Sequence, residues 1–172
     1  MPILNIITMP DPILRTRSQS IERVDDDLRR LASDMLETMY AAPGIGLAAI
    51  QVAVPRRLLV LDLTEKENEP DNPIVMINPE IVKLGDTLVP YEEGCLSIPD
   101  IRVEIERPSS LTVRFLDREG KTQQLDADGL LATAIQHEMD HLDGKLIIDF
   151  LSRLKRDMII RKMKKHARDG KA

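Results

Sequence analysis

Cysteine, aromatic residues and long apolar runs are all scarce in this sequence. Cys95 is the only cysteine, and aromatic residues make up 2% of the chain. A single cysteine excludes an intrachain disulfide and suits a reducing compartment. No apolar run approaches the ~18 residues that a membrane-spanning helix needs, and the first residues lack the basic start and cleavage site of an export signal. We therefore expect a cytoplasmic protein with no membrane partner.

The charge is distributed unevenly along the chain. The net charge is −5, but residues 152–172 hold nine Lys or Arg against two Asp, which leaves +7 on this tail and −12 on the rest. The 172 residues, of which 42% are apolar, suit one domain that buries about two-thirds of its unfolded surface. We expect a single domain over 1–172, with 152–172 as a basic C-terminal helix and tail that suits a polyanionic partner.

Residues 136–141, Gln-His-Glu-Met-Asp-His, form the pattern that most directly indicates chemistry. On a helix with ~3.6 residues per turn, His137 and His141 share one face and Glu138 lies beside them. Two imidazoles bind a divalent cation that lowers the pKa of a water molecule, and the carboxylate takes the proton and later delivers it to a leaving group. An exposed polar helix face is the alternative, but so specific a pattern favours metal-assisted hydrolysis.

The third metal ligand distinguishes classes of hydrolase. One class of metalloprotease places a histidine where this chain has Ile147, and another uses a later glutamate, which does not occur after Glu138. Asp149 and Asp157 remain possible ligands, yet the soft thiolate of Cys95 is the stronger candidate. A metallopeptidase is the first alternative function.

Residues 44–51, Gly-Ile-Gly-Leu-Ala-Ala-Ile-Gln, fit the letters of a dinucleotide-binding fingerprint. That fingerprint must follow a strand and open a helix, whereas here a helical pattern precedes it and Pro55 leaves no room for a crossover helix. We instead expect a strand or loop whose glycines let a ligand approach the backbone closely. Gln51 at its end can donate to a developing oxyanion, unless the segment is a plain turn with a surface glutamine.

Periodicity predicts a helix at the start of the chain and strands in its centre. Apolar residues at helical spacing indicate a packing helix over about 25–42, with Asp25 or Asp26 as its N-cap. Short apolar runs and alternating segments indicate strands at 58–63, 74–77, 81–84, 101–105, 111–116 and 121–125.

A second helix should carry the two histidines of the metal-binding pattern. Asp126 or Asp128 can cap it, and Gly144 ends it. Four residues supply the apolar face that would bury it: Leu130, Leu131, Ala134 and Ile135. Burial would shield the histidines and strengthen the field of a bound cation. A last amphipathic helix is expected from about Ser152 to His166.

Together with residues 93–97, Glu-Gly-Cys-Leu-Ser, segments 44–51 and 136–141 resemble the three signature motifs of the peptide deformylase family. Their order and spacing agree with that family, and the resemblance covers almost the whole chain. It implies an α+β fold in which antiparallel β-sheets surround a central metal-binding helix, with an N-terminal packing helix and a C-terminal helix. It also implies removal of the formyl group from the N-terminal N-formylmethionine of nascent polypeptides, with release of formate.

The resemblance also implies roles for particular residues. These roles are metal binding by Cys95, His137 and His141, acid–base catalysis by Glu138, and oxyanion binding by Gln51 and the backbone N–H of Leu96. In the family one divalent metal ion is bound, usually Fe2+ in the cell, with Zn2+, Ni2+ or Co2+ as substitutes, so the ligands alone do not identify it. Asp140 and Arg102 are candidates to support the site from nearby.

The substrate sets the shape of the expected pocket. A formyl group is small and a methionine side chain is long and unbranched, so a tight metal end should adjoin an apolar slot. The candidate substrate-binding residues are Ile45, Gly46, Gly94, Leu130 and Ala134. Plain core packing is an equal alternative for the apolar ones. Ala134 stands where many relatives have cysteine, which would widen the slot slightly.

The basic C-terminal helix resembles the extension that some bacterial deformylases use to dock on the ribosome, and a solvated helix face is the alternative. No transit peptide is visible, so we expect a bacterial cytoplasmic monomer that acts on nascent N-formylmethionyl polypeptides. A non-catalytic, ribosome-associated binding protein is the second alternative function. The intact Glu138, Gln51 and ligand set argue against it, because a binding protein has no chemical need for them.

Overall fold

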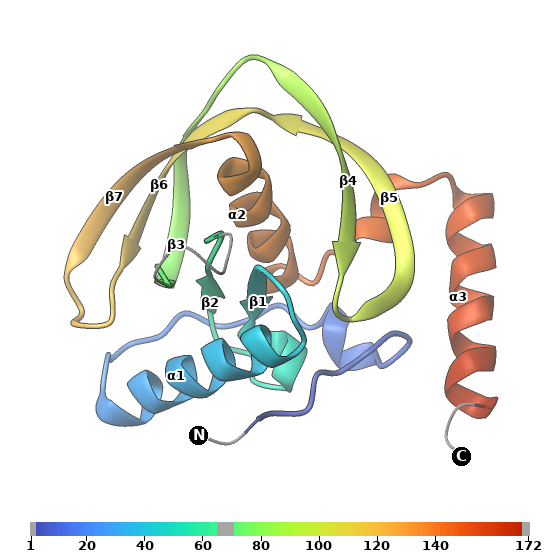
Figure 1. The fold of residues 1–172 in the computed structure, drawn as a ribbon, viewed down its shortest axis with the longest axis horizontal. Coiled ribbons are helices and arrows are strands. Elements are labelled where there is room, and N and C mark those ends of the chain that lie inside the picture. Colours follow the sequence, from blue (N-terminus) through green and yellow to red (C-terminus); the bar gives the residue numbers. More distant parts are fainter. Residues whose placement is uncertain (1–2, 65–70, 170–172) are drawn as a thin grey trace.

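The computed structural model describes residues 3–64 and 71–169, so the last part of the predicted basic tail lies outside the described residues. Figure 1 shows the elements, which follow one another in this order: η1 (Pro12–Arg15), α1 (Asp26–Ala41), β1 (Gly46–Ala48), η2 (Ala49–Val52), β2 (Leu58–Leu61), β3 (Ile74–Leu84), β4 (Leu88–Cys95), β5 (Ile98–Pro108), β6 (Ser110–Leu116), β7 (Thr122–Asp128), α2 (Gly129–Leu142), η4 (Ile147–Phe150) and α3 (Arg153–Asp169).

The named strands form two antiparallel sheets. The larger sheet has five strands in the order β1-β2-β3-β6-β7, and the smaller sheet pairs β4 with β5. Helix α2 lies between the part of the larger sheet formed by β3, β6 and β7 and the arch of β4 and β5 (Figure 1). This arrangement confirms the predicted α+β fold with sheets around a central helix.

Helix α1 begins where its capping residue predicts. The carboxylate of Asp25 accepts a hydrogen bond from the backbone N–H of Leu28 at 2.9 Å, which satisfies one of the free donors of the first turn. The apolar face of the helix, including Met35 and Met39, packs in one cluster with Leu58 and Val60 of β2. Burial of each large side chain contributes ~1.5–3 kcal/mol, so this packing holds β2 and its neighbour β1 in place.

Helix α2 is buried over most of its length, and its N-cap position falls on one of the two predicted residues. Asp128 occupies the N-cap position without a side-chain capping bond. Asp126 instead accepts a hydrogen bond from Thr112 Oγ1 at 2.7 Å. Both aspartates belong to β7, whose pairing with β6 places Asp126 directly opposite Thr112. The carboxylate of Asp126, which the sequence predicted as a possible helix cap, therefore binds the neighbouring strand instead.

One long strand, β3, replaces the two strands predicted at 74–77 and 81–84. The strand continues through Asn78 and the proline after it, with an irregular register against β6 at this point. Asn78 has a φ angle of 50°, a left-handed conformation that asparagine tolerates. Its side-chain amide also accepts from the N–H of Ile21 and donates to the carbonyl of Ile21, each at 2.8 Å. These bonds let the strand bend without ending.

Helix α3 lies at the outer side of the molecule, next to β5 (Figure 1). Met163 is its buried residue, in a cluster with Val103 and Ile105 of β5. Leu154 and Met158 are exposed, as are most of the basic residues of the helix. In the described part of the chain, no helix is long and apolar enough to cross a membrane.

Candidate metal centre

Three candidate metal ligands converge from two distant parts of the chain. Cys95 ends β4, and His137 and His141 lie one turn apart on α2. Each offers one donor atom, and these atoms lie within 4.8 Å of one another. Cys95 Sγ and His141 Nε2 are 3.4 Å apart, close to the ~3.5 Å expected between a thiolate and an imidazole on one tetrahedral ion. The donor set fits a divalent transition metal such as iron or zinc.

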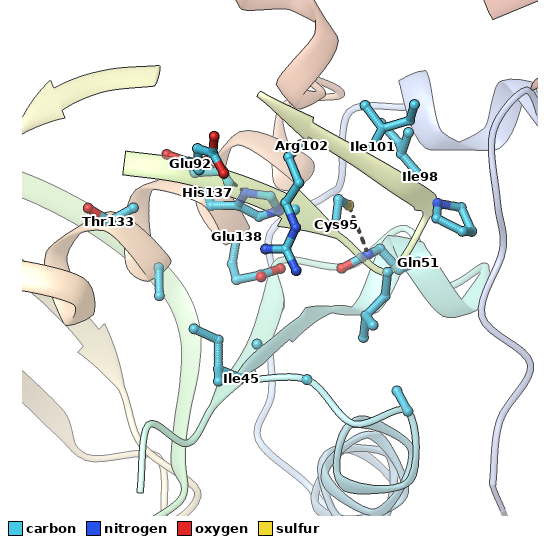
Figure 2. A pocket seen from close by; sticks show the side chains of 18 of the residues that line it. Ile45, Gln51, Glu92, Cys95, Ile98, Ile101, Arg102, Thr133, His137 and Glu138 are labelled. Carbon is cyan, nitrogen blue, oxygen red and sulfur yellow. Dashed lines mark hydrogen bonds and ion pairs between the residues drawn. The ribbon is translucent and has the colours of Figure 1, made fainter. Parts of the chain in front are cut away.

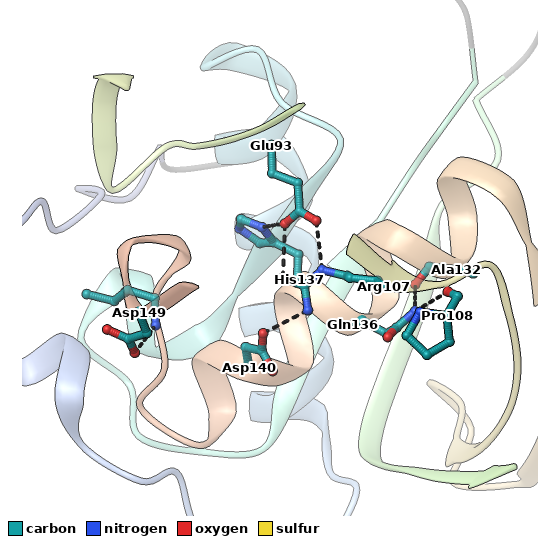
Figure 3. Close-up of polar contacts among 9 residues, drawn as sticks. Glu93, Arg107, Pro108, Ala132, Gln136, His137, Asp140 and Asp149 are labelled. Atoms are coloured by element: carbon teal, nitrogen blue, oxygen red, sulfur yellow. Dashed lines mark hydrogen bonds and ion pairs between the residues drawn. The ribbon is translucent and has the colours of Figure 1, made fainter. Parts of the chain in front are cut away.

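A carboxylate holds the other nitrogen of His137. Glu93 Oε1 lies 3.0 Å from His137 Nδ1, and an ionised carboxylate requires this nitrogen to be the donor. Arg107 donates to both oxygens of Glu93, at 2.7 and 3.0 Å, and to Asp140 at 3.0 Å (Figure 3). The network fixes the orientation of the imidazole and, when His137 is neutral, the tautomer that leaves Nε2 available to a metal.

Burial and charge oppose each other in this network. Burial raises the pKa of Glu93, but hydrogen bonds from His137 and Arg107 outweigh it, so the net pKa is lowered. Burial lowers the pKa of Arg107, but contacts with Glu93 and Asp140 outweigh it, so the net pKa is raised. Glu93 and Arg107 are therefore both charged at neutral pH, as an ion pair enclosed by protein.

The two histidines have different proton affinities. Burial, reinforced by the charges of His137 and Arg107, holds the pKa of His141 well below its usual range. His141 is therefore neutral, the form that binds a metal. Burial also acts to lower the pKa of His137, but contacts with Cys95 and Glu93 raise it well above its usual range. A metal must therefore displace a proton from His137, so its affinity should depend on pH.

Glu138 is a buried carboxyl group beside the ligands. It is 6% exposed, and its Oε1 atom has no hydrogen-bond partner among the described residues. Gly46 of β1 passes so close that a Cβ atom there would lie 2.6 Å from Glu138 Oε2, so any other residue would displace the carboxylate. Burial raises the pKa of Glu138 to about 7. Such a group can take up a proton and return it near neutral pH.

The side chain of Gln51 in η2 is held at both ends. Its Oε1 accepts from the Ala48 N–H at 2.9 Å, and its Nε2 donates to Ser97 Oγ at 3.0 Å. Nε2 also lies 3.7 Å from Cys95 Sγ, so the amide faces the candidate ligand (Figure 2). Leu96 follows Cys95 in the turn between β4 and β5. The amide nitrogen of Gln51 is thus positioned before any substrate binds.

Cys95, His137 and Glu138 line a cavity of about 890 Å³. The residues predicted to bind the substrate all line it: Ile45, Gly46, Gly94, Leu130 and Ala134. Ile45 and Leu130 are 43% and 47% exposed, whereas Ala134 is buried. The prediction that Leu130 belongs to the buried face of α2 was therefore wrong, because it faces the open cavity. Thr133, which the motifs did not indicate, also lines the cavity.

The structure rules out several alternative assignments. The dinucleotide-binding interpretation fails because β1 pairs antiparallel with β2 and only the short η2 separates them. Asp149 binds Arg15 through two hydrogen bonds, at 2.7 and 2.9 Å, and Asp157 is exposed on α3. Neither aspartate belongs to the group of three potential ligands.

Glu93 and Arg107 are the functional residues that sequence reasoning missed. We expected Arg102 and Asp140 as supporting residues, but Arg107 is the residue that binds Asp140, while Arg102 lines the cavity. A signal was present in β5, where Arg107 continues the inward alternation of two buried residues, Val103 and Ile105. An arginine on a buried face needs an acidic partner, and Glu93, in the motif at residues 93–97, is that partner.

Comparisons with known proteins all indicate one family. The sequence model described as polypeptide deformylase matches residues 3–157. A peptide deformylase of Agrobacterium fabrum is 61% identical over 98% of each chain, and one of Rhizobium meliloti is 59% identical over 98% of this chain and 96% of the relative. The crystal structure of peptide deformylase from Ehrlichia chaffeensis has a TM-score of 0.91 at 40% identity, covering 97% of this chain and 98% of that one. A complex of the Ehrlichia chaffeensis protein with actinonin has a TM-score of 0.90 at 43% identity, covering 96% and 98%.

Proposed function

The chain belongs to the polypeptide deformylase family, and we propose that Cys95, His137 and His141 bind the metal ion on which this family depends. The protein is a hydrolase that removes the formyl group from the N-terminal N-formylmethionine of nascent polypeptides and releases formate. One observation supports the assignment of residues most directly: the three donor atoms lie within 4.8 Å of one another, and the buried Glu138 lines the same cavity as Cys95 and His137 (Figure 2).

Glu138 is the proposed general base and general acid. When bound, the metal ion polarises the formyl carbonyl and lowers the pKa of water. Glu138 takes a proton from the attacking water, whose oxygen forms a bond to the formyl carbon. The bond between this carbon and the amide nitrogen then breaks, and Glu138 delivers the proton to the departing amine. Burial, which raises the pKa of Glu138, suits a group that must both take up and release a proton.

Gln51 and the backbone N–H of Leu96 are the proposed donors to the oxyanion. The hydrogen bond from Ala48 to Gln51 Oε1 turns the amide nitrogen toward Cys95. A donor that is already oriented needs no reorganisation as negative charge develops on the formyl oxygen. Loss of one such donor typically costs ~3 kcal/mol of transition-state stabilisation.

The cavity supports a binding mode for the first residue of the substrate. Its apolar lining by Ile45, Leu130 and Ala134 suits an unbranched thioether side chain, while Gly46 and Gly94 let the substrate backbone approach closely. In this arrangement the formyl group reaches Glu138 while the rest of the polypeptide leaves through the open mouth beside Ile45 and Leu130.

The remaining proposals concern the setting of the enzyme. Fe2+ is the proposed metal in the cell, with Zn2+, Ni2+ or Co2+ as substitutes, because one thiolate and two imidazoles suit all four. The exposed basic residues of α3 support docking of this helix on the ribosome. We place the protein in a bacterial cytoplasm as a monomer with one domain over residues 1–172.

The test is formate release from a short N-formylmethionyl peptide by protein purified without oxygen, with metal content measured on the same sample. Cys95→Ala should lose both metal and activity, whereas Glu138→Ala should lose activity and keep the metal. Glu80→Ala, which changes an exposed carboxylate on β3, should behave like the unaltered protein. Full activity in Cys95→Ala or Glu138→Ala would refute the assigned roles.

A further inference from the structure

An aromatic ring covers the arginine of the metal-centre network. Phe150 is the last residue of η4, the short turn between α2 and α3. The centre of its ring lies 4.9 Å from Arg107 Cζ, within the range of a cation–π contact. Phe150 is 49% exposed, whereas Arg107 is only 6% exposed. The ring therefore lies between the guanidinium and solvent.

The position of η4 depends on its own contacts. The carboxylate of Asp149 receives two hydrogen bonds from Arg15, at 2.7 and 2.9 Å, and a third from the N–H of Leu146 at 3.0 Å. Ile147 and Ile148 are buried in the same cluster as Val103 and Ile105 of β5. The backbone that carries Phe150 is thus anchored on both sides, so its ring stays over Arg107.

The contacts of Arg107 lead from this ring to a proposed metal ligand. Its guanidinium donates to both oxygens of Glu93, and Glu93 Oε1 contacts His137 Nδ1 at 3.0 Å (Figure 3). An ion pair weakens when water reaches it, because water competes for its hydrogen bonds and raises the local dielectric constant. Phe150 attracts the cation and excludes water from its outer face at the same time.

We propose that Phe150 is a positioning residue for the metal centre, which acts through Arg107 and Glu93 on His137. The inference rests on the proposed ligand set of Cys95, His137 and His141. It assigns a role to an aromatic side chain that is half exposed in a chain with only two phenylalanines. The effect on metal affinity should be smaller than that of losing Glu93, because Phe150 lies two contacts further from the metal ligand.

The test compares four variants in Zn2+ binding. Phe150→Leu and Phe150→Met remove the ring and keep an apolar side chain, while Phe150→Tyr keeps the ring. Leu154→Ala is the matched control, because Leu154 is a nearby apolar residue, at the start of α3, and is 69% exposed. Zn2+ affinity is measured on purified protein by competition with a coloured chelator. The visible absorption of the Co2+-loaded protein reports the ligand geometry, and thermal unfolding of the metal-free variants reports the fold.

We expect Phe150→Leu and Phe150→Met to lower the Zn2+ affinity about 2- to 5-fold and to change the Co2+ spectrum. Phe150→Tyr and Leu154→Ala should match the unaltered protein. Unchanged affinity and spectrum in both ring-free variants would overturn the inference, and so would an equal loss in Phe150→Tyr or Leu154→Ala. If the unaltered protein bound no Zn2+, the ligand set would fail and this inference with it. Tight binding that is insensitive to the ring would overturn this inference alone.

Discussion

Helices α2 and α3 have similar lengths but differ in where their polar residues lie. In α2, the polar residues Gln136, His137, Glu138 and His141 are buried, while Leu130 is exposed at the cavity. In α3, the charged residues face solvent, and Met163 is the buried residue. A buried polar group costs free energy unless it has a partner. The buried polar residues of α2 therefore indicate a site, whereas the solvent-facing charges of α3 are what any surface helix shows.

Two ion pairs of this protein show the same contrast, because one is buried and the other is exposed to solvent. The side chains of Glu93 and Arg107 are 5% and 7% exposed, whereas those of Glu80 and Arg114 on the larger sheet are 68% and 49% exposed. Water screens the exposed pair, so its removal changes little. The enclosed pair cannot lose one member without leaving a charge in a poorly solvated environment. Substitutions in the enclosed pair should therefore have effects that are larger than those in the exposed pair and different in kind.

Replacing the buried carboxyl group of α2 should have the largest effect. Glu138→Gln keeps the shape of the side chain but cannot accept the proton of the attacking water, so we expect kcat to fall by roughly 10³-fold or more. The metal content should stay the same, because Glu138 is not a proposed ligand. The check is formate release measured together with metal analysis. Activity within tenfold of the unaltered enzyme would contradict the assigned role.

Breaking the enclosed ion pair should have the next largest effect. Glu93→Gln removes the charge that orients His137 and leaves Arg107 with Asp140 alone, so we expect a ~10- to 100-fold loss of metal affinity. The free energy of unfolding should fall by ~3 kcal/mol. The matched variant Glu80→Gln should change it by at most about 1 kcal/mol. Zn2+ competition and urea unfolding measure both quantities, and equal effects of the two variants would contradict the comparison.

The buried carboxyl group should also make the stability of the metal-free protein depend on pH. Burial raises the pKa of Glu138 from 4.5 to about 7, so between these values the folded state holds a proton that the unfolded state has released. The free energy of unfolding should therefore fall as pH rises through this window, by up to ~3 kcal/mol.

Glu138→Gln isolates this contribution, because it lacks the titrating group and keeps the other ionisable groups. Urea unfolding of the metal-free protein and the variant at pH 4.5 and pH 7.5 makes the comparison. Between pH 4.5 and pH 7.5, the free energy of unfolding of the unaltered protein should fall by up to ~3 kcal/mol relative to that of the variant. A difference that is the same at both pH values would show that the carboxyl group ionises normally.

Changes on the exposed helix should have the smallest effect on the enzyme. Lys162 and Lys165 are both exposed on α3, so Lys162→Glu with Lys165→Glu should change the free energy of unfolding by less than about 0.5 kcal/mol. The rate of formate release from a short peptide should not change. Binding to purified ribosomes, measured by co-sedimentation, should weaken if α3 docks there, and unchanged binding would contradict that proposal.

The same contrast explains which features could be predicted from the sequence. The Asp25 cap of α1, the spacing of His137 and His141 and the β6–β7 hairpin all depend on residues close together in the chain, where helical and strand periodicity apply directly. Asp128 occupies the predicted N-cap position of α2, but Asp126 does not cap the helix, because it binds Thr112 of another strand. The prediction of two separate strands at 74–77 and 81–84 was wrong, because hydrogen bonds between Asn78 and Ile21 let one strand, β3, continue.

By itself the sequence determined the kind of chemistry, because the side chains of one short helical segment supply two metal-binding imidazoles and a carboxyl group. Only the tertiary structure decided where Cys95 meets these histidines and how Arg107 and Glu93 orient one of them. The tertiary structure also placed the Phe150 ring over Arg107 and brought the backbone of Gly46 close to the carboxylate of Glu138. These contacts join residues far apart in the chain, so they depend on strand register and packing, which local periodicity does not specify.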